Sequence, residues 1–480
     1  MSTAPPPTSH DAVTQAAAEP SAGAEAPAAA AAAPRSLKQK AMRGGMWTAG
    51  GVTLTQMLAF ASNIILAMVL VPEHFGIMAL INMIIVGLQM FSDVGITPCL
   101  VQNKREDADF YNTAWTFQVI RGFVLWLAAC LLAWPLSKIK PDWAPLATYL
   151  PVAAFTTVLA GFRSTGYITT QRRMEVSKIA TVEFTTALIR TVVMIIVAFA
   201  ITRSPWALVV GLLVGSLYTT AVSHFMQPDV RNRLAFDRTA AAEMFNYGKW
   251  LFFSTIITYF AMVTDTFLIG GMISTAVLGV FWVARRFAEL GPMIFQKVGE
   301  WVGFPALSEV YRTNPEEFGN RLFRLRRAVL LPIYALLLGM LLLAPVLMYF
   351  CYRNASSALF VEAGWMIQVL AVNALAGMLA SSYASVYLAI GRTFYNMLSV
   401  ATQFIAVLTG TMVGYWLGGE TGLFLGLGVS QFAKYAVDAA LVKRCGYLQL
   451  KFDACLLIFG GVAALGAILA SNWIVMNLVF

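Results

Sequence analysis

Long stretches of apolar residues recur along the whole chain, and short segments between them hold most of the charged residues. The stretches are continuous rather than alternating with a period of two, which favours helices over strands. A helix needs about 20 apolar residues to cross a bilayer, and in lipid only helices or closed barrels satisfy their backbone polar groups. The pattern predicts an all-α polytopic membrane protein with spans at about 46–71, 75–100, 111–136, 144–163, 179–202, 205–226, 246–272, 275–305, 327–350, 360–390, 394–417, 421–442 and 453–478.

Composition and charge placement support this interpretation. Apolar residues make up 59% of the 480 positions and charged residues 12%, whereas soluble domains carry about 25% charged residues. The net charge of +9 does not indicate a nucleic-acid partner, because the basic residues lie in short loops between apolar stretches. Alternate loops, counted with the N-terminal tail, hold 22 Lys and Arg, and the opposite loops hold four. The positive-inside rule then places the N-terminus in the cytoplasm.

The chain also contains an internal repeat. At an offset of 203 residues, Gly45-Met46-Trp47 aligns with Gly248-Lys249-Trp250, and Phe75-Gly76-Ile77 aligns with Leu278-Gly279-Val280. The offset spans six predicted helices, so both copies have the same orientation. This predicts two six-helix lobes related by a pseudo-twofold axis along the membrane normal. The predicted organisation is a disordered Ala/Pro-rich cytoplasmic tail at 1–44, lobes at 45–243 and 244–443, and an additional transmembrane helix within 444–480.

Several motifs, taken in order, carry a resemblance to a known family. They are Leu70-Val71-Pro72-Glu73-His74-Phe75-Gly76, Ser92-Asp93-Val94-Gly95-Ile96, Gln171-Arg172-Arg173-Met174, Trp206-Ala207-Leu208-Val209 and Phe304-Pro305-Ala306-Leu307. Over about residues 36–445 the chain resembles Wzx-type polysaccharide flippases of the multidrug/oligosaccharidyl-lipid/polysaccharide superfamily. It departs from their pattern at Gly271, where the family commonly has a basic residue, and at Phe281, where it usually has Tyr.

The resemblance implies two lobes around a central cavity that opens alternately to either side of the bacterial inner membrane. The implied substrate is an undecaprenyl-diphosphate-linked oligosaccharide repeat unit, moved from the cytoplasmic to the periplasmic leaflet. Membrane lipid, a polysaccharide polymerase and export machinery are the further partners that the resemblance suggests. It implies no covalent chemistry and no cofactor.

Charged residues inside the spans are the candidate functional residues, because buried charge in a membrane usually faces a cavity or a partner. At 1.5 Å per residue, Arg121 lies about 15 Å into its span. Cations outnumber anions at such depth, and a cationic cavity suits a diphosphate because Arg and Lys bind phosphate oxygens. We predict that the diphosphate binds mainly Arg121 and Arg285. The other deep charged residues are Arg286, Arg190 and Lys434, which we expect to contribute, and the acidic Asp265 and Glu289.

The same residues admit structural interpretations. Arg285 and Glu289 are four residues apart, as are Lys434 and Asp438, so each pair can neutralise itself on one helix face. Asp265 is either a protonation or cation site that couples transport to an ion gradient, or a member of an ion pair between helices. Both alternatives stay open at this stage.

Two other functions are alternatives to the flippase. A drug or organic-cation antiporter on the same fold needs carboxylates that dominate the cavity, whereas cations dominate the predicted spans. A membrane-embedded polysaccharide polymerase needs a sizeable extramembrane region, but no predicted loop is longer than about 20 residues. The pattern therefore favours a transporter over an enzyme, and it predicts neither a metal nor an organic cofactor.

Overall fold

The computed structural model describes residues 50–51, 53–92, 108–173, 175–227, 229–299 and 303–479. The predicted tail at 1–44, the Gly-x-Trp motif at 45–47 and residues 93–96 of the second motif lie outside the described residues. Within the described ranges the secondary structure is helical, without a strand. Eight of the described helices are long and apolar enough to cross a membrane, and Thr53–Ala67 and Leu146–Gly161 are shorter apolar helices. The chain is therefore an all-α, multi-pass membrane protein.

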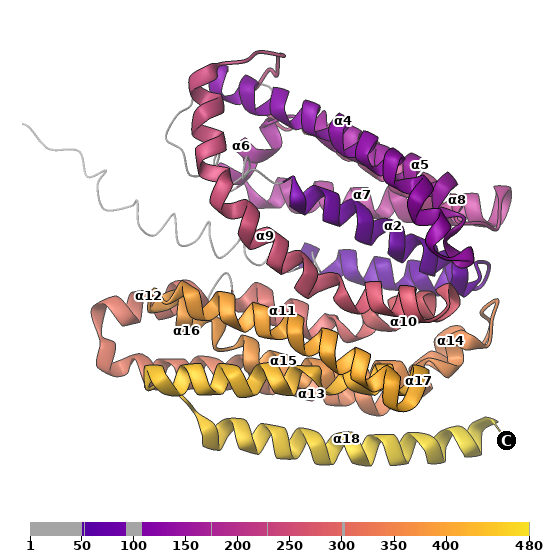
Figure 1. Ribbon diagram of the computed structural model, residues 1–480, viewed down its shortest axis with the longest axis vertical. Helices are drawn as coiled ribbons and strands as arrows, with labels where there is room; N and C mark the ends of the chain where they lie inside the picture. Colours follow the sequence, from indigo (N-terminus) through magenta and orange to yellow (C-terminus); the bar gives the residue numbers. More distant parts are fainter. Residues whose placement is uncertain are drawn as a thin grey trace, which may run out of the picture.

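The N-terminal half of the chain forms the upper part of the molecule in Figure 1. Its main contacts pair α4 with α5 and α7 with α8, and α5 also contacts α8. The helices are Thr53–Ala67, α2 (Pro72–Phe91), α4 (Ala108–Ile139), α5 (Leu146–Gly161), α6 (Gly166–Arg172), α7 (Val176–Ile196) with a π-helical continuation at Val197–Ile201, and α8 (Trp206–Ser223).

The C-terminal half forms the lower part of the view, with α18 outermost along α13 and α15 (Figure 1). The helix α9 runs obliquely between the two halves and contacts α2, α4 and α17. The helices are α9 (Arg238–Met272), α10 (Thr275–Ala288), α11 (Leu290–Val298), α12 (Phe304–Thr313), α13 (Phe318–Tyr352), α14 (Leu359–Glu362), α15 (Gly364–Ser381), α16 (Ala384–Ala389), α17 (Thr393–Cys445) and α18 (Leu450–Val479).

Two predicted spans are interrupted. The span predicted at 275–305 is divided into α10, α11 and α12. Pro292 explains the first break: it has no N–H to donate to the carbonyl one turn earlier, and its ring crowds that carbonyl. The span predicted at 360–390 is likewise divided into α14, α15 and α16. The broken segments lie where cavities occur, as shown below.

The helix α17 contains both spans predicted at 394–417 and 421–442, because they meet in a bend at Gly418 and Gly419. Gly419 has a φ of 57°, a left-handed conformation that favours glycine. A Cβ on Gly426 would lie 1.9 Å from the carbonyl oxygen of Gly410. The two halves of the hairpin therefore approach backbone to backbone, which small residues permit in membrane proteins.

The two halves of the chain meet where α2 crosses α10. A Cβ on Gly76 would lie 1.9 Å from the carbonyl oxygen of Thr275, and a Cβ on Gly279 would lie 1.8 Å from that of Pro72. Gly76 and Gly279 are separated by the repeat offset of 203 residues, and so are Pro72 and Thr275. The contact is therefore reciprocal, as expected of elements related by a twofold axis.

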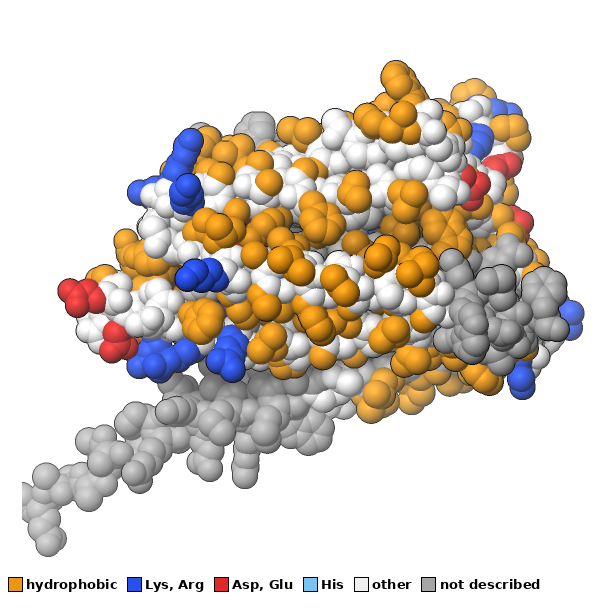
Figure 2. Space-filling model, turned by 90° about the horizontal axis from the view of Figure 1, so that it is seen from below, with side chains coloured by type: hydrophobic (Ala, Val, Ile, Leu, Met, Phe, Trp, Pro, Cys, Tyr) orange, Lys and Arg blue, Asp and Glu red, His pale blue; other side chains and the backbone are white. Residues whose placement is uncertain are grey.

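Further contacts join the two halves at the end of the molecule that carries few basic residues. Trp143 Nε1 donates to the carbonyl oxygen of Gly270 at 3.2 Å, and Lys140 Nζ donates to that of Ile273. The backbone N–H of Ser356 donates to Ala67 at 2.9 Å. Figure 2 shows hydrophobic side chains over the middle of one face and charged side chains gathered at its two ends. We call the end with these contacts the low-charge end, and the opposite end, near α6 and α12, the basic end.

Candidate transport site

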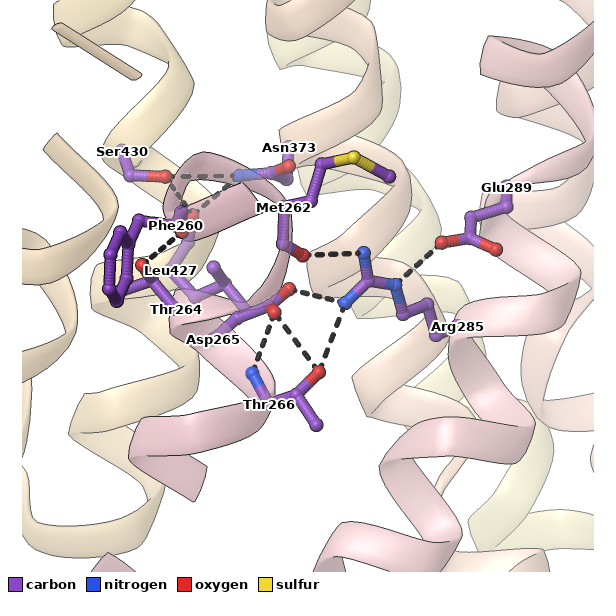
Figure 3. Close-up of polar contacts among 10 residues, drawn as sticks. All are labelled: Phe260, Met262, Thr264, Asp265, Thr266, Arg285, Glu289, Asn373, Leu427 and Ser430. Carbon is purple, nitrogen blue, oxygen red and sulfur yellow. Dashed lines mark hydrogen bonds and ion pairs between the residues drawn. The ribbon is translucent and has the colours of Figure 1, made fainter. Parts of the chain in front are cut away.

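Arg285 is the centre of a charged cluster between α9 and α10 (Figure 3). Its Nη1 lies 2.7 Å from Asp265 Oδ2 and its Nε lies 2.6 Å from Glu289 Oε1. Nη1 also donates to Thr266 Oγ1, and Nη2 donates to the carbonyl oxygen of Met262, each at 3.4 Å. The helical spacing of Arg285 and Glu289 explains one ion pair, and the packing of α9 beside α10 supplies the other. The structure therefore contains both ion pairs offered as structural interpretations: Arg285 with Glu289 on one helix, and Asp265 with Arg285 between helices.

This cluster borders a cavity of about 570 Å³ in the C-terminal half. Among the described residues, its charged lining consists of Asp265, Glu289 and Arg285, so described carboxylates outnumber described cations there. The remaining polar lining consists of uncharged groups that hydrogen-bond to hydroxyls, namely Gln296, Asn373, Ser381, Ser385, Gln403 and Gln431. Asn373 is held in place because its Nδ2 donates to the carbonyl oxygen of Leu427 at 2.6 Å. The lining suits a sugar or a cation better than a phosphate.

Arg190 and Arg286 are two arginines that come from the two halves of the chain. Arg190 lies on α7, and Arg286 lies on α10 with its guanidinium 4.7 Å from the centre of the Trp282 ring. Gly215 on α8 gives Arg190 room, because a Cβ there would lie 3.2 Å from the Arg190 Cβ. Neither arginine makes an ion pair with a carboxylate within the described ranges. Arg286 lines a pocket with Glu289. A further anion near these arginines would lower the cost of holding like charges in a low-dielectric region.

Arg121 belongs to α4, and its side chain lies against the C-terminal end of α2. Its Nε donates to Ser92 Oγ at 2.8 Å and its Nη2 donates to the carbonyl oxygen of Gln89 at 2.5 Å. A cation there also interacts favourably with the helix dipole. Arg121 lines a second cavity, of about 540 Å³, between α2, α4, α5 and α6. The structure thus places Arg121 in a different cavity from Arg285, whereas the sequence analysis put both at one diphosphate.

Lys434 is buried and pairs with Asp438 on its own helix, with 3.0 Å between Nζ and Oδ2. Asp438 also accepts hydrogen bonds from Ser399 at 3.0 Å and from Tyr387 at 3.3 Å. Lys434 does not line either of the two cavities above. The structure therefore contains the ion pair of Lys434 with Asp438 on one helix face that their spacing suggested.

Two arginines that the sequence analysis did not name as candidates prove to be buried or partly buried. Arg163 follows α5 and lines the second cavity with Arg121. Arg326 on α13 is 3% exposed and lies 2.7 Å from Asp453 of α18. The sequence signal that could have identified the second pair is Asp453, a carboxylate at the start of an apolar span. No sequence pattern indicated that Arg163 borders a cavity, because α6 was not predicted.

The fold defines a class of membrane transporter. Over 91% of this chain and 100% of the other, it is similar to the lipid II flippase MurJ, with a TM-score of 0.67 and 12% identity. It is also similar to an inward-facing multidrug-resistance MATE transporter of the MOP superfamily, with a TM-score of 0.62 and 14% identity, over 88% of this chain and 98% of the other. At these identities the likeness establishes the MATE/MurJ-like transporter fold.

Sequence comparison identifies the family. The family described as polysaccharide biosynthesis protein matches residues 65–355, so the chain belongs to it. The chain is 24% identical over 312 residues to the lipopolysaccharide biosynthesis protein WzxC of Escherichia coli, covering 64% of this chain and 62% of WzxC. It is 23% identical over 269 residues to the succinoglycan biosynthesis transport protein ExoT of Rhizobium meliloti, covering 55% of this chain and 53% of ExoT. The matches thus span somewhat more than half the length of these relatives.

Proposed function

We propose that this protein flips an undecaprenyl-diphosphate-linked oligosaccharide repeat unit from the cytoplasmic to the periplasmic leaflet of a bacterial inner membrane. The family membership, the transport relative ExoT and the fold of the lipid flippase MurJ support a transporter of this kind. The observation that carries the proposal is a set of two arginines, Arg190 on α7 and Arg286 on α10, that come from the two halves of the chain and make no ion pair within the described ranges. Such a pair requires an anion, and a diphosphate supplies it.

The headgroup contacts follow from how each cation is held. Arg190 and Arg286 are predicted phosphate ligands that make no ion pair within the described ranges. Arg121, the third predicted ligand, is held by hydrogen bonds to Ser92 and Gln89. Arg285 binds phosphate only if Glu289 or Asp265 releases it. Lys434 binds phosphate only if Asp438 releases it. The amide-lined cavity beside Arg285 provides hydroxyl-binding groups for the sugars. The polyprenyl tail stays in the bilayer, so no covalent step is needed.

Translocation proceeds by alternating access between lobes 45–243 and 244–443. Contacts through Trp143, Lys140 and Ser356 join the lobes at the low-charge end, which the charge asymmetry assigns to the periplasm. Release into the periplasmic leaflet then requires the crossing of α2 and α10 at Gly76 and Gly279 to separate. A polymerase and export machinery are the partners that would consume the delivered unit.

A drug or organic-cation antiporter is the second candidate. The observation that favours it is the acidic excess of the Asp265–Glu289 cavity, because carboxylates bind organic cations. The two functions require opposite charges, so they predict opposite effects of the same substitutions.

Transport in proteoliposomes tests the proposal. Wild type is expected to move a labelled lipid-linked oligosaccharide between leaflets, and Arg190→Ala and Arg286→Ala are expected to lower the rate at least tenfold, since charged hydrogen bonds contribute about 1.5–3 kcal/mol. Lys at each position is expected to restore part of the rate. Arg324→Ala, an exposed residue on α13, is the matched control for charge. Transport of an organic cation by wild type, lost in Asp265→Asn and without movement of the lipid, would establish the antiporter instead.

A further inference from the structure

The cavity between α2, α4, α5 and α6 differs in charge from the one beside Arg285. Among the described residues, its charged lining consists of Arg121 and Arg163, without a carboxylate. The volume of about 540 Å³ lies within the range of roughly 300–1,000 Å³ typical of ligand pockets. A pocket of this size with two arginines and no carboxylate among its described lining residues favours an anionic ligand.

Arg163 is only partly satisfied by the protein. Its Nε is buried and has no hydrogen-bond partner within the described part of the chain. The guanidinium lies 5.2 Å from the centre of the Tyr167 ring, which holds its plane in position. A buried donor without an acceptor costs about 1–3 kcal/mol, and a ligand oxygen in the cavity would remove that cost.

The uncharged lining of this cavity also has unused hydrogen-bonding capacity. Gln89, Gln118 and Gln171 line it from three helices, and their side-chain amides make no hydrogen bond within the described residues. Gly122 and Gly161 bring α4 and α5 together, since a Cβ on Gly122 would lie 2.6 Å from the carbonyl oxygen of Thr157. The close crossing of α4 and α5 fixes Arg121 and Arg163 on adjacent helical segments at one wall.

The surroundings indicate which anion reaches the cavity. On α4, the neighbours of Arg121 on the outer surface are apolar and exposed: Ile120 is 53% and Val124 is 59% exposed. Phe162, next to Arg163, contacts Phe123 with 5.9 Å between ring centres. An apolar surface directly beside two cations suits a molecule with a lipid tail and a phosphate headgroup.

We infer that this cavity is a second phosphate-binding site, within the N-terminal lobe, that takes the diphosphate headgroup of the lipid-linked sugar at the basic end before it reaches Arg190 and Arg286. The inference rests on the proposed function, because it takes the proposed substrate as its ligand. Arg163 binds the phosphate oxygens, and Arg121 and the three glutamines complete the contacts. Glu183 is the carboxylate that acts on Arg163, and it accepts a hydrogen bond from the Tyr167 hydroxyl at 3.3 Å.

Equilibrium binding to the purified full-length protein tests the site with three probes: inorganic pyrophosphate, a lipid-linked diphospho-oligosaccharide, and the same glycan without phosphate. Wild type is expected to bind the first two and not the third. Arg163→Ala is expected to weaken both by tenfold or more, because it removes a fork of charged donors. Arg163→Lys is expected to recover part of the affinity, and Arg324→Ala to bind as wild type. Glu183→Gln, at an exposed position, is expected to strengthen binding severalfold, so the test does not depend on one variant that could fold poorly.

The outcomes separate the site from the transport function. Unchanged affinity for both phosphate probes in Arg163→Ala and Glu183→Gln would overturn the site, even if wild type transports the lipid. Pyrophosphate binding that depends on Arg163, without binding of the lipid-linked form, would overturn the lipid headgroup as its ligand and leave a site for a soluble phosphate compound. Absence of lipid movement in proteoliposomes, with Arg163-dependent binding intact, would count against the proposed function alone.

Discussion

Two ion pairs in the C-terminal half have the same length and very different surroundings. Arg326–Asp453 and Arg285–Asp265 each measure 2.7 Å. The side chains of the first pair are 2% and 0% exposed, and those of the second are 26% and 15% exposed. Distance alone therefore does not distinguish a structural charge from one that a substrate or an ion can reach.

The hydrogen bonds around the two pairs explain the difference. Arg326 also donates to Ser382 at 2.9 Å, to the Tyr383 hydroxyl at 2.9 Å and to Gln449 at 3.0 Å. Asp453 accepts from Tyr435 at 3.0 Å in addition. These partners come from several helices, so the cluster joins α18 to α13, α15 and α17. A buried charged network that is fully satisfied specifies one arrangement, whereas Arg285 has partners that a ligand in the cavity can replace.

The largest expected effect is on the buried pair. Asp453→Asn leaves Arg326 buried without its anion, and breaking a buried pair from one side costs about 3–5 kcal/mol. We expect the unfolding temperature in detergent to fall by several degrees or more, with the yield of inserted protein falling in parallel. Thermal unfolding followed by fluorescence measures this effect. A stability equal to that of wild type would show that the buried pair does not hold α18 in place.

Asp265→Asn is expected to change transport much more than stability. Arg285 keeps Glu289, and the pair borders a cavity, so we expect a loss of stability below about 1 kcal/mol. The transport rate and its dependence on an imposed ion gradient are expected to change. Parallel measurement of unfolding temperature and of transport in proteoliposomes checks this. A destabilisation as large as that of Asp453→Asn would remove the distinction between the two pairs.

The smallest expected effect sharpens the comparison within the buried cluster. Tyr435→Phe removes one hydrogen bond to Asp453 and keeps the ion pair and the Tyr383 contact. A hydrogen bond to a charged group contributes about 1.5 kcal/mol, so the unfolding temperature should fall by less than in Asp453→Asn. Transport per folded molecule is expected to equal that of wild type. Lost transport at unchanged stability would give this tyrosine a role beyond packing.

The fold was predictable where apolar stretches are long and uninterrupted. Run length placed α4, α13 and α18 within a few residues at their apolar parts. The 203-residue offset aligned Gly76 with Gly279 as equivalent positions, and the structure adds that they lie in contact. The breaks near Pro292 and near Ser382 fall inside predicted spans that are longer than a bilayer requires, and this excess length already suggests a kink. Hydropathy does not locate the breaks, because it averages over a helix and does not register where its hydrogen bonds stop. Both breaks adjoin the cavity beside Arg285.

The candidate site was less predictable, because charge pairing between helices depends on packing. Sequence spacing anticipated Arg285–Glu289 and Lys434–Asp438, since both partners lie on one helix. It could not choose between the alternatives for Asp265, whose partner lies on the next helix. It also did not identify Arg326, which is buried and pairs with Asp453, 127 residues further along the chain.

The reciprocal crossing of α2 and α10 has a consequence for how the low-charge end opens. The same close approach occurs twice, at Gly76 and at Gly279, so a rigid separation of α2 from α10 must break both approaches in one movement. Intermediate openings would lose packing at both points and gain no passage for a headgroup. We therefore expect this end to behave cooperatively, with a shut and an open population and few molecules between them, rather than as a gate that widens gradually.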